Sequence, residues 1–351
     1  MRKHIISLLL AIVMILSGIS LYSCASNPEK FTEHSLDLFD TATTVTGYEW
    51  REEDFRTVSE EILSELLEYH RLYTIYNRYD GLENLCTVND VVDGVHREVK
   101  VDQKIIDMLL FAKKMYRETD GAVNVAMGSV LSIWHDYRTA GMDEPWGAEL
   151  PPMDQLLEAA EHTNIEDVII DEEKSTVFLA DPEMSLDVGA IAKGYAVERV
   201  AQMLEDKGIT GYVINVGGNV RTVGYKYDEE PWTAGVENPD TDADKAYLVY
   251  LDIAGESVVT SGSYQRFYTV GDKNYHHIID PETLMPSERY LSVSVVCKNS
   301  GQGDALSTAL FCMPLDEGMA LVEETPDVEV LWVLPDGTQK TSSGFADYVK
   351  E

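Results

Sequence analysis

The sequence predicts one continuous α+β domain, and three observations support this fold class. Apolar residues recur at helical spacing over residues 54–70 and again over residues 103–117. From residue 212 onward, short apolar runs of strand length dominate the chain. Between residues 36 and 351 no linker rich in Pro, Gly or Ser and no internal repeat divides the chain.

Helices and strands are predicted along the whole domain. Residues 39–48 are rich in Thr and favour a strand, and the helices over 54–70 and 103–117 follow. Two apolar runs around the turn DEEK predict a hairpin of residues 168–170 and 177–179. A helix over 190–207 ends at Gly208, a residue type that often terminates helices. Strands are then predicted at 212–216, 220–224, 232–236, 246–253, 266–270, 275–279, 291–297 and 328–334, with helices at 304–313 and 316–323.

The charge of the chain excludes one class of partner. The chain has 62 acidic and 27 basic residues, a formal net charge of −35, and its hydrophobic content of 44% is that of a globular protein. Such a surface repels nucleic acid, so no nucleic-acid partner is expected. A bound polyphosphate would need local lysines or a metal ion. The simplest alternative is that the acidity keeps an exported protein soluble.

The N-terminus has the pattern of an export signal. Arg2 and Lys3 precede an apolar stretch over residues 5–19, and the run ends in LYSC, which resembles a bacterial lipoprotein cleavage box. We therefore expect a signal peptide over residues 1–23, lipidation of Cys24 and a polar tether over residues 24–35. An uncleaved anchor helix is the alternative, although about 15 apolar residues are short for a membrane span.

The remaining cysteines indicate neither a disulfide framework nor a metal site. Cys86, Cys297 and Cys312 are odd in number and lack metal-ligand spacing. Cys297 lies in an apolar, strand-like run and Cys312 in an apolar helix. Both are expected to be small buried hydrophobic side chains.

Four segments between the predicted elements carry glycines and polar residues suited to a ligand. TDGAVNVAMG (119–128) follows a helix, and Gly121 allows close approach of the backbone, although a plain capped turn would look the same. LDVGAIAKGYA (186–196) places Asp187 near a helix start and Lys193 where an ammonium could meet a phosphate. INVGGN (214–219) and TSGSYQRF (260–267) read as a tight hairpin and a hydroxyl-rich turn.

Two further segments carry a candidate base and a candidate metal site. HHIIDP (276–281) places His277 beside an Asp-Pro turn, and an unperturbed imidazole titrates near neutrality. GDALSTAL (303–310) opens a predicted helix with Asp304 and Thr308, which share one helical face. Two such oxygen ligands suit Mg²⁺. A structural histidine and an ordinary helix cap are the alternatives.

Together these six segments, in this order, resemble the FAD:protein FMN transferase (ApbE) family from about residue 36 to the C-terminus. The resemblance implies a single T-fold-like domain with mixed, mainly antiparallel sheets and packed helices. It also implies Mg²⁺-assisted cleavage of FAD, with FMN transferred to a Thr or Ser hydroxyl of an acceptor protein and AMP released. The acceptors would be extracytoplasmic redox subunits or domains, and a lipid on Cys24 would hold the enzyme at the same face of the cell membrane.

The resemblance also assigns residues position by position. His277 matches the proposed base, and the metal would be held by Asp304, Thr308 and the Ala190 carbonyl, with Ser307 in reach. Flavin-contacting positions are matched by Phe39, Tyr76, Ala122, Val123, Asn124, Asp187, Lys193 and Ile278. The chain departs from the family pattern at 39–41, where Phe-Asp-Thr replaces Met-Gly-Thr, and at 123–124, where Val-Asn replaces an aromatic residue and Asp.

Two other functions stay open from the sequence. An FAD pyrophosphatase would release FMN and AMP to water with the same residues. A non-catalytic flavin-binding lipoprotein would not need His277, Asp304 and Thr308, all of which are present. A peptidase-like hydrolase is disfavoured because no nucleophile-elbow motif occurs.

Overall fold

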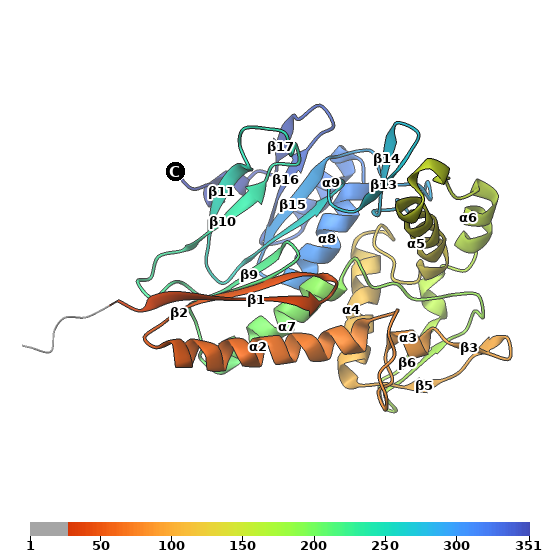
Figure 1. The fold of residues 1–351 in the computed structure, drawn as a ribbon, viewed down its shortest axis with the longest axis horizontal. Coiled ribbons are helices and arrows are strands. Elements are labelled where there is room, and N and C mark those ends of the chain that lie inside the picture. The colour runs from red at the N-terminus through yellow and green to blue at the C-terminus, as the bar shows by residue number, and fades with distance from the viewer. Residues whose placement is uncertain (1–26) are drawn as a thin grey trace, which may run out of the picture.

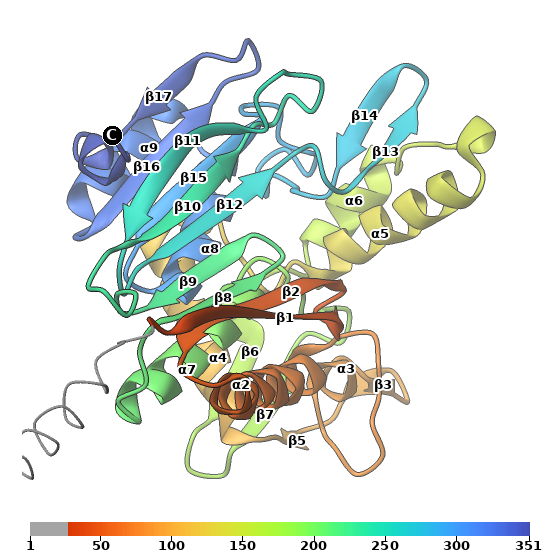
Figure 2. The ribbon, with the colours of Figure 1, turned by 60° about the vertical axis from the view of Figure 1, so that its left-hand side comes forward.

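A large antiparallel sheet with helices on one face and a hairpin on the other forms the core of the molecule (Figures 1 and 2). The structure, a computed structural model, describes residues 27–351. Its eight-stranded sheet has the order β1-β2-β8-β9-β12-β15-β16-β17. These strands are β1 (Glu29–Leu38), β2 (Thr41–Glu49), β8 (Tyr212–Val216), β9 (Asn219–Val223), β12 (Ser257–Gly262), β15 (Ser292–Cys297), β16 (Val328–Val333) and β17 (Gln339–Thr341). The predicted α+β class is confirmed.

Burial along the strands follows their place in the sheet. β15 is buried at all six positions because both faces of the sheet are covered there. β2 alternates between buried and partly exposed positions, as a strand with one covered face should. β1, at the edge, is mostly exposed and carries charged side chains, a common protection of an edge strand against pairing with another chain.

The helices pack mainly on one face of the sheet. They are α2 (Glu52–Tyr73), α3 (Leu85–Val88), α4 (Gln103–Glu118), α5 (Gly128–Asp143), α6 (Met153–Ala160), α7 (Ala192–Asp206), α8 (Ser300–Cys312) and α9 (Leu315–Glu324), with 3₁₀ turns η1 (Pro145–Gly147), η2 (Ile165–Asp167) and η3 (Phe345–Tyr348). Residues of α2, α4, α7 and α8 form the main hydrophobic core together with β8 and β15. Burial of this apolar face provides most of the stabilisation of the helices.

Four small sheets complete the fold of residues 27–351. They are β3 (Val91–Val92) with β4 (Val95–His96), β5 (Val99–Lys100) with β7 (Thr176–Leu179) and β6 (Val168–Asp171), β10 (Trp232–Glu237) with β11 (Tyr247–Ile253), and β13 (Phe267–Val270) with β14 (Lys273–His276). β10 and β11 cover the second face of the large sheet through a core that includes Trp232, Leu251 and Leu331. A third core joins α5 and α6 to β13 through Trp134, Leu156 and Tyr268.

The structure corrects the extent of the polar tether. The sequence predicts a tether over residues 24–35, but β1 begins at Glu29 and pairs with β2 from Glu29↔Glu49 onward. The charged residues of β1 do not form an apolar pattern from which a strand would be predicted, because an edge strand needs few apolar side chains. The predicted signal peptide over residues 1–23 and the lipidation site Cys24 lie outside the described residues.

Several other elements differ from the predictions. The helices α5 and α6 were not predicted, and TSGSYQRF, read as a turn, begins within β12. The second strand of the β13–β14 hairpin was placed at 275–279 but ends at His276. The helix predicted at 304–313 begins at Ser300, where the Asn299 side chain caps it by accepting from the N–H of Gln302. Asp304 therefore lies in the second turn and is not a helix cap.

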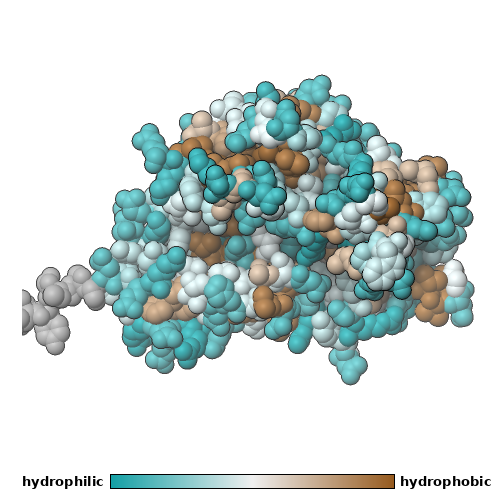
Figure 3. Space-filling view, turned by 45° about the horizontal axis from the view of Figure 1, so that its top comes forward, coloured by the Kyte–Doolittle hydropathy of each residue, from teal (hydrophilic) through white to brown (hydrophobic). Residues whose placement is uncertain are grey.

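The surface agrees with the composition. The face shown in Figure 3 is largely hydrophilic, with small separate apolar patches around a central hollow. Within residues 27–351, Cys297 and Cys312 are buried free thiols, as expected, and Cys86 is free and partly buried. No helix in that range is long and apolar enough to cross a membrane.

Candidate functional site

A cavity of about 250 Å³ lies where the large sheet meets α5, α7, α8 and the β13–β14 hairpin. All six segments singled out in the sequence contribute to its wall. Their residues in the wall include Asn124, Lys193, Asn219, Ser261, His277 and Asp304. These segments are far apart in the sequence, so the fold brings together the residues that the motifs predicted.

The carboxylate of Asp304 joins α7 to α8 at the base of the cavity. Asp304 is 4% exposed, and its Oδ2 accepts a 2.8 Å hydrogen bond from the backbone N–H of Gly194. The Lys193 ammonium lies 3.8 Å from the same oxygen and donates to the carbonyl of Gly189 at 3.2 Å. Burial raises the pKa of Asp304, and Lys193, Gly194 and Asn219 partly offset this effect. The Asp304 carboxylate is thus held in a fixed position in which it can bind a cation.

Hydroxyl groups extend this oxygen-rich base of the cavity. The Thr308 hydroxyl, one turn after Asp304, lies 3.3 Å from the Ser261 hydroxyl of β12. Ser261 also lies 2.9 Å from the hydroxyl of Ser307. The buried Oδ1 of Asn219, beside the double-glycine turn, has no hydrogen-bond partner among residues 27–351. An unpaired polar atom in a cavity wall indicates a bound ligand or water.

The two adjacent histidines have different environments. His276 is buried and uses both ring nitrogens: Nε2 donates to the Ser287 carbonyl at 2.8 Å, and Nδ1 accepts from the N–H of Ile278 at 3.2 Å. His277 lines the cavity, and its Nδ1 lies 3.3 Å from the Arg266 carbonyl. A carbonyl can only accept, so this contact places the ring proton on Nδ1 and leaves Nε2 as a proton acceptor.

Positive charge gathers in the cavity wall. Arg138, Lys193 and Arg266 line it, against the two carboxylates Asp187 and Asp304. Burial, and then these three cations and His276, lower the pKa of His277 to about 3, so its imidazole is neutral at physiological pH. On a chain of net charge −35, this local excess of cations favours an anionic ligand.

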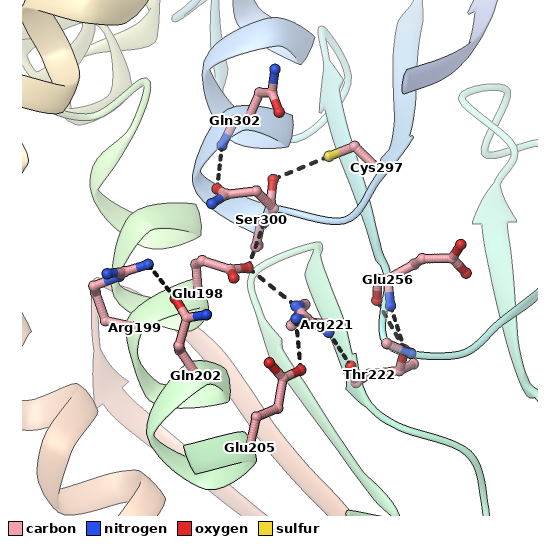
Figure 4. Close-up of polar contacts among 12 residues, drawn as sticks. Glu198, Arg199, Gln202, Glu205, Arg221, Thr222, Glu256, Cys297, Ser300 and Gln302 are labelled. Atoms are coloured by element: carbon pink, nitrogen blue, oxygen red, sulfur yellow. Dashed lines mark hydrogen bonds and ion pairs between the residues drawn. The ribbon is translucent and has the colours of Figure 1, made fainter. Parts of the chain in front are cut away.

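A buried ion network holds α7 and α8 together behind the cavity (Figure 4). Glu198 of α7 accepts from the backbone N–H of Ser300 at 2.9 Å and from Nε of Arg221 in β9 at 3.1 Å. Arg221 also donates to Glu205 at 2.9 Å. α7 and α8 are thus joined by two reciprocal hydrogen bonds. The backbone N–H of Gly194 in α7 donates to Asp304 of α8, and the backbone N–H of Ser300 in α8 donates to Glu198 of α7.

Comparison with known proteins decides the family. The ApbE family model matches residues 39–332. The FAD:protein FMN transferase of Klebsiella pneumoniae (strain 342) is 34% identical over 272 residues, covering 75% of this chain and 81% of the relative. The chain belongs to the ApbE family. The FAD:protein FMN transferase of Treponema pallidum (strain Nichols) is 33% identical, covering 72% of this chain and 71% of that protein.

Solved ApbE structures share the fold. The crystal structure of the ApbE protein of Thermotoga maritima matches with a TM-score of 0.79 and 27% identity, covering 92% of this chain and all of that one. The flavin transferase ApbE of Vibrio cholerae matches with a TM-score of 0.74 and 26% identity, covering 92% of this chain and 99% of that one. The family and the single ApbE-like α+β domain predicted from the sequence are confirmed.

Most of the predicted ApbE site residues lie in the cavity wall. Besides His277, Asp304 and Thr308, the wall contains Tyr76, Ala122, Val123, Asn124, Asp187, Ala190, Lys193 and Ile278. Asn124 uses its amide within the loop, donating to the carbonyl of Thr163 and accepting from the N–H of Ala126. Asp187 accepts from the N–H of Gly189 at 2.8 Å, and burial raises its pKa.

Two of the predicted site residues, Phe39 and Ser307, lie outside the cavity wall. Phe39 and Asp40 form the two-residue turn between β1 and β2, both with positive φ. The Phe39 ring contacts His70 of α2, and Thr41 lines the cavity instead. Ser307 is fully buried, and its hydroxyl donates to the backbone carbonyl of Asp304, so it reaches the cavity only through Ser261.

Several wall residues were not assigned from the sequence. His135 and Arg138 lie on α5, a helix that the sequence pattern does not predict, and Arg138 contacts the His135 ring at 3.0 Å. Asn219 and Arg266 belong to segments that were singled out, but no role was given to them. The two Asn residues that flank the double-glycine turn were the sequence signal that could have identified Asn219. In the structure Asn215 caps the turn, and Asn219 lines the cavity.

The donor set suits a hard cation. Asp304, Thr308 and Ala190 line the same cavity, and the first two supply oxygen donors from one face of α8. Within residues 27–351 no three His, Cys, Asp or Glu side chains cluster closely enough to hold a metal by themselves. A cation here would therefore combine Asp304 with hydroxyl, carbonyl and substrate oxygens, as is common for Mg²⁺.

Proposed function

We propose that this chain transfers FMN from FAD to a Thr or Ser hydroxyl of an acceptor protein and releases AMP. The observation that carries the proposal is the shared cavity of an ApbE domain. There, a neutral imidazole, a buried carboxylate and three cationic side chains face one space. Relatives that are about one-third identical are FAD:protein FMN transferases. The excess of cations suits the pyrophosphate of FAD.

The chemistry follows from the residues. Nε2 of His277 accepts the proton of the acceptor hydroxyl, which is a poor nucleophile unless a base assists it. The oxygen then attacks the FMN phosphorus, and the bond between that phosphorus and the bridging oxygen breaks, so AMP leaves. Lys193, Arg138 and Arg266 hold the phosphate oxygens and stabilise the negative charge that develops on them.

Magnesium would be held by the side chains of Asp304 and Thr308 and by the Ala190 carbonyl. When bound, the ion would neutralise pyrophosphate charge and polarise the phosphorus. Tyr76, Asp187 and the loop over residues 122–124 are proposed to contact FAD, because they line the adjoining part of the wall.

The proposed location is the extracytoplasmic face of the cell membrane. The export signal over residues 1–23 and the cleavage box before Cys24 support a lipid anchor. The acceptor would then be an extracytoplasmic redox subunit or domain, which carries its target hydroxyl on the same side of the membrane.

The test co-expresses the chain with a redox subunit that a related FAD:protein FMN transferase labels in a parallel control reaction. We expect a fluorescent flavin band on the acceptor after denaturing electrophoresis, with AMP released in equal amount. The band should disappear when the acceptor hydroxyl is replaced by Ala, or when the enzyme carries Asp304→Ala or His277→Ala. Release of FMN and AMP without any labelled acceptor would overturn the transferase assignment in favour of a pyrophosphatase.

A further inference from the structure

The early start of β1 leaves only a short connection to the proposed lipid anchor. Four residues, 25–28, separate Cys24 from Glu29, the first residue of β1. A fully extended chain spans at most about 3.6 Å per residue, so the Glu29 end lies within about 18 Å of an anchored Cys24. This end of the sheet must therefore stay close to the membrane.

β1 connects that end to the catalytic cavity. It has ten residues, which corresponds to about 30 Å at the usual rise of a strand. Its far end enters the Phe39–Asp40 turn, and the next residue, Thr41, lines the cavity. In Figure 1, β1 runs along the longest axis of the molecule, from its left end toward the middle. The anchor and the cavity therefore lie at opposite ends of one strand.

Aromatic side chains gather on the anchor side. Tyr48, Trp50, Tyr225 and Tyr227 line a surface hollow of about 380 Å³ together with Pro28, and we call these four the anchor-side aromatic surface. Trp50 is 63% exposed and Tyr225 is 54% exposed. Tyr48 pairs with Lys30 in the β1–β2 register, so it lies level with the first residues of β1.

We propose that the anchor-side aromatic surface rests in the headgroup region of the bilayer and holds the cavity about 30 Å from the membrane. The inference depends on the proposed lipid anchor. Tyr and Trp favour the membrane–water interface because each combines an apolar ring with a polar group. The anchor makes the contact intramolecular, so even a weak preference suffices to orient the domain.

Charge cannot provide this contact. A chain of net charge −35 is repelled by anionic headgroups, and the lining of the hollow includes one acidic residue, Glu49, and one basic residue, Lys226. The aromatic rings supply an attraction that does not depend on the lipid charge. The bilayer is also the surface that the short connection already brings to this side of the domain.

The orientation restricts the acceptor. Its target hydroxyl must reach a cavity about 30 Å above the bilayer, the length of β1. A membrane-bound redox subunit would therefore present that hydroxyl on a projecting domain and not at the bilayer surface.

Tryptophan fluorescence tests the orientation directly. The chain has five Trp residues, of which Trp134, Trp232 and Trp332 are buried, whereas Trp50 and Trp146 are exposed. Trp146 is 89% exposed and lies in η1, directly after the cavity-lining helix α5. It is a matched control at the cavity end.

The lipidated mature chain, which begins at Cys24, is reconstituted in phosphatidylcholine vesicles with and without brominated acyl chains. We expect brominated lipid to quench the wild type, Trp50→Phe to remove most of that quenching, and Trp146→Phe to leave it. Quenching that is absent, unchanged by Trp50→Phe or removed by Trp146→Phe would overturn the orientation.

Two further measurements separate the possible failures. Flotation of the wild type with vesicles, lost in a chain that begins at Ala25 and so lacks both the signal peptide and the lipidated cysteine, supports the anchor, and a wild type that does not float overturns this inference. Flavin transfer is measured on the same preparations in detergent with the redox subunit. Retained transfer without quenching of Trp50 counts against the orientation alone, whereas quenching without transfer supports the orientation and counts against the proposed activity.

Discussion

The backbone N–H of Gly194 donates a 2.8 Å hydrogen bond to the carboxylate of Asp304, and this contact joins α7 to α8 at close range. It is possible only because residue 194 lacks a side chain. A Cβ there would lie 2.3 Å from the carbonyl oxygen of Ser300 and 2.5 Å from Cβ of Asp304. The helix that carries Lys193 and the helix that carries the candidate metal ligands therefore meet backbone to backbone.

Replacing Gly194 by Ala should separate the two helices. Overpacking of this kind costs about 1–3 kcal/mol, and we expect that loss in urea unfolding together with a higher Mg²⁺ requirement for flavin transfer. Gly147→Ala is the control, because a Cβ at Gly147 meets no atom of residues 27–351 within 4 Å. Unchanged stability and Mg²⁺ dependence in Gly194→Ala would show that the helix contact tolerates a methyl group.

Asp304→Asn should separate the metal role of this residue from its structural role. The amide has the size of the carboxylate and can still accept from Gly194, so the fold should persist. Loss of the charge should lower Mg²⁺-dependent transfer by a factor of about 100 or more, since a bound metal contributes several kcal/mol to such a reaction. Transfer rates are measured against Mg²⁺ concentration, with Asp316→Asn on the exposed start of α9 as control. A full rate at saturating Mg²⁺ would exclude Asp304 as a necessary ligand.

The pH dependence of the reaction should depend on Arg266. The pKa of His277 is lowered to about 3, mainly by burial and then by Arg266. The base is therefore neutral well below pH 6.5, and kcat/KM of the wild type should not fall as the pH passes through the ordinary histidine pKa. Arg266→Gln removes a charge that disfavours imidazolium, so the pKa of His277 rises and the acidic limb moves to higher pH.

The control for this pH experiment is Arg56→Gln, on the exposed face of α2. It removes the same charge far from His277 in the sequence and outside the cavity wall, and its profile should match the wild type. An acidic limb that stays in place in Arg266→Gln, or moves to lower pH, would argue against His277 as the base.

Sequence patterns predicted the site better than they predicted the elements that carry it. All six motif segments reach one cavity, because their glycines and polar residues are needed wherever backbone approaches a ligand. Arg138 was missed with its helix, since α5 mixes Ser, Thr and Gly with few buried residues. Phe39 was misplaced because the direction of a turn side chain depends on its partner, here His70.

The start of α8 shows why element boundaries need tertiary information. Its first turn, Ser-Gly-Gln-Gly, has low helix propensity. Gly301 is accommodated against the backbone of Tyr195, and Gly303 against Val259 and Cys297. Packing against α7, β12 and β15 thus overrides the low helix propensity of these residues. Because the helix starts earlier than predicted, Asp304 is a buried carboxylate inside the helix and not its N-cap.

Glu198 should position the cavity without contacting a ligand. It is buried, does not line the cavity wall, and binds both Arg221 and the first N–H of α8. In the part of the chain that the structure describes, Glu198→Ala leaves the buried Arg221 with Glu205 as its one charged partner and removes the acceptor of the Ser300 backbone N–H. Breaking a buried pair costs about 3–5 kcal/mol, and the remaining Glu205 contact places the expected loss near the lower end.

A double-mutant cycle gives the decisive measurement. Arg221→Met removes the charge that Glu198 neutralises, so Glu198→Gln combined with Arg221→Met should be less destabilised than the sum of the two single variants. Flavin transfer should show a higher Mg²⁺ requirement in Glu198→Gln, because a displaced α8 moves Asp304 and Thr308, while the pH profile set by His277 stays the same. Additive losses of unfolding free energy with an unchanged Mg²⁺ requirement would instead mean that α8 holds its position without this network.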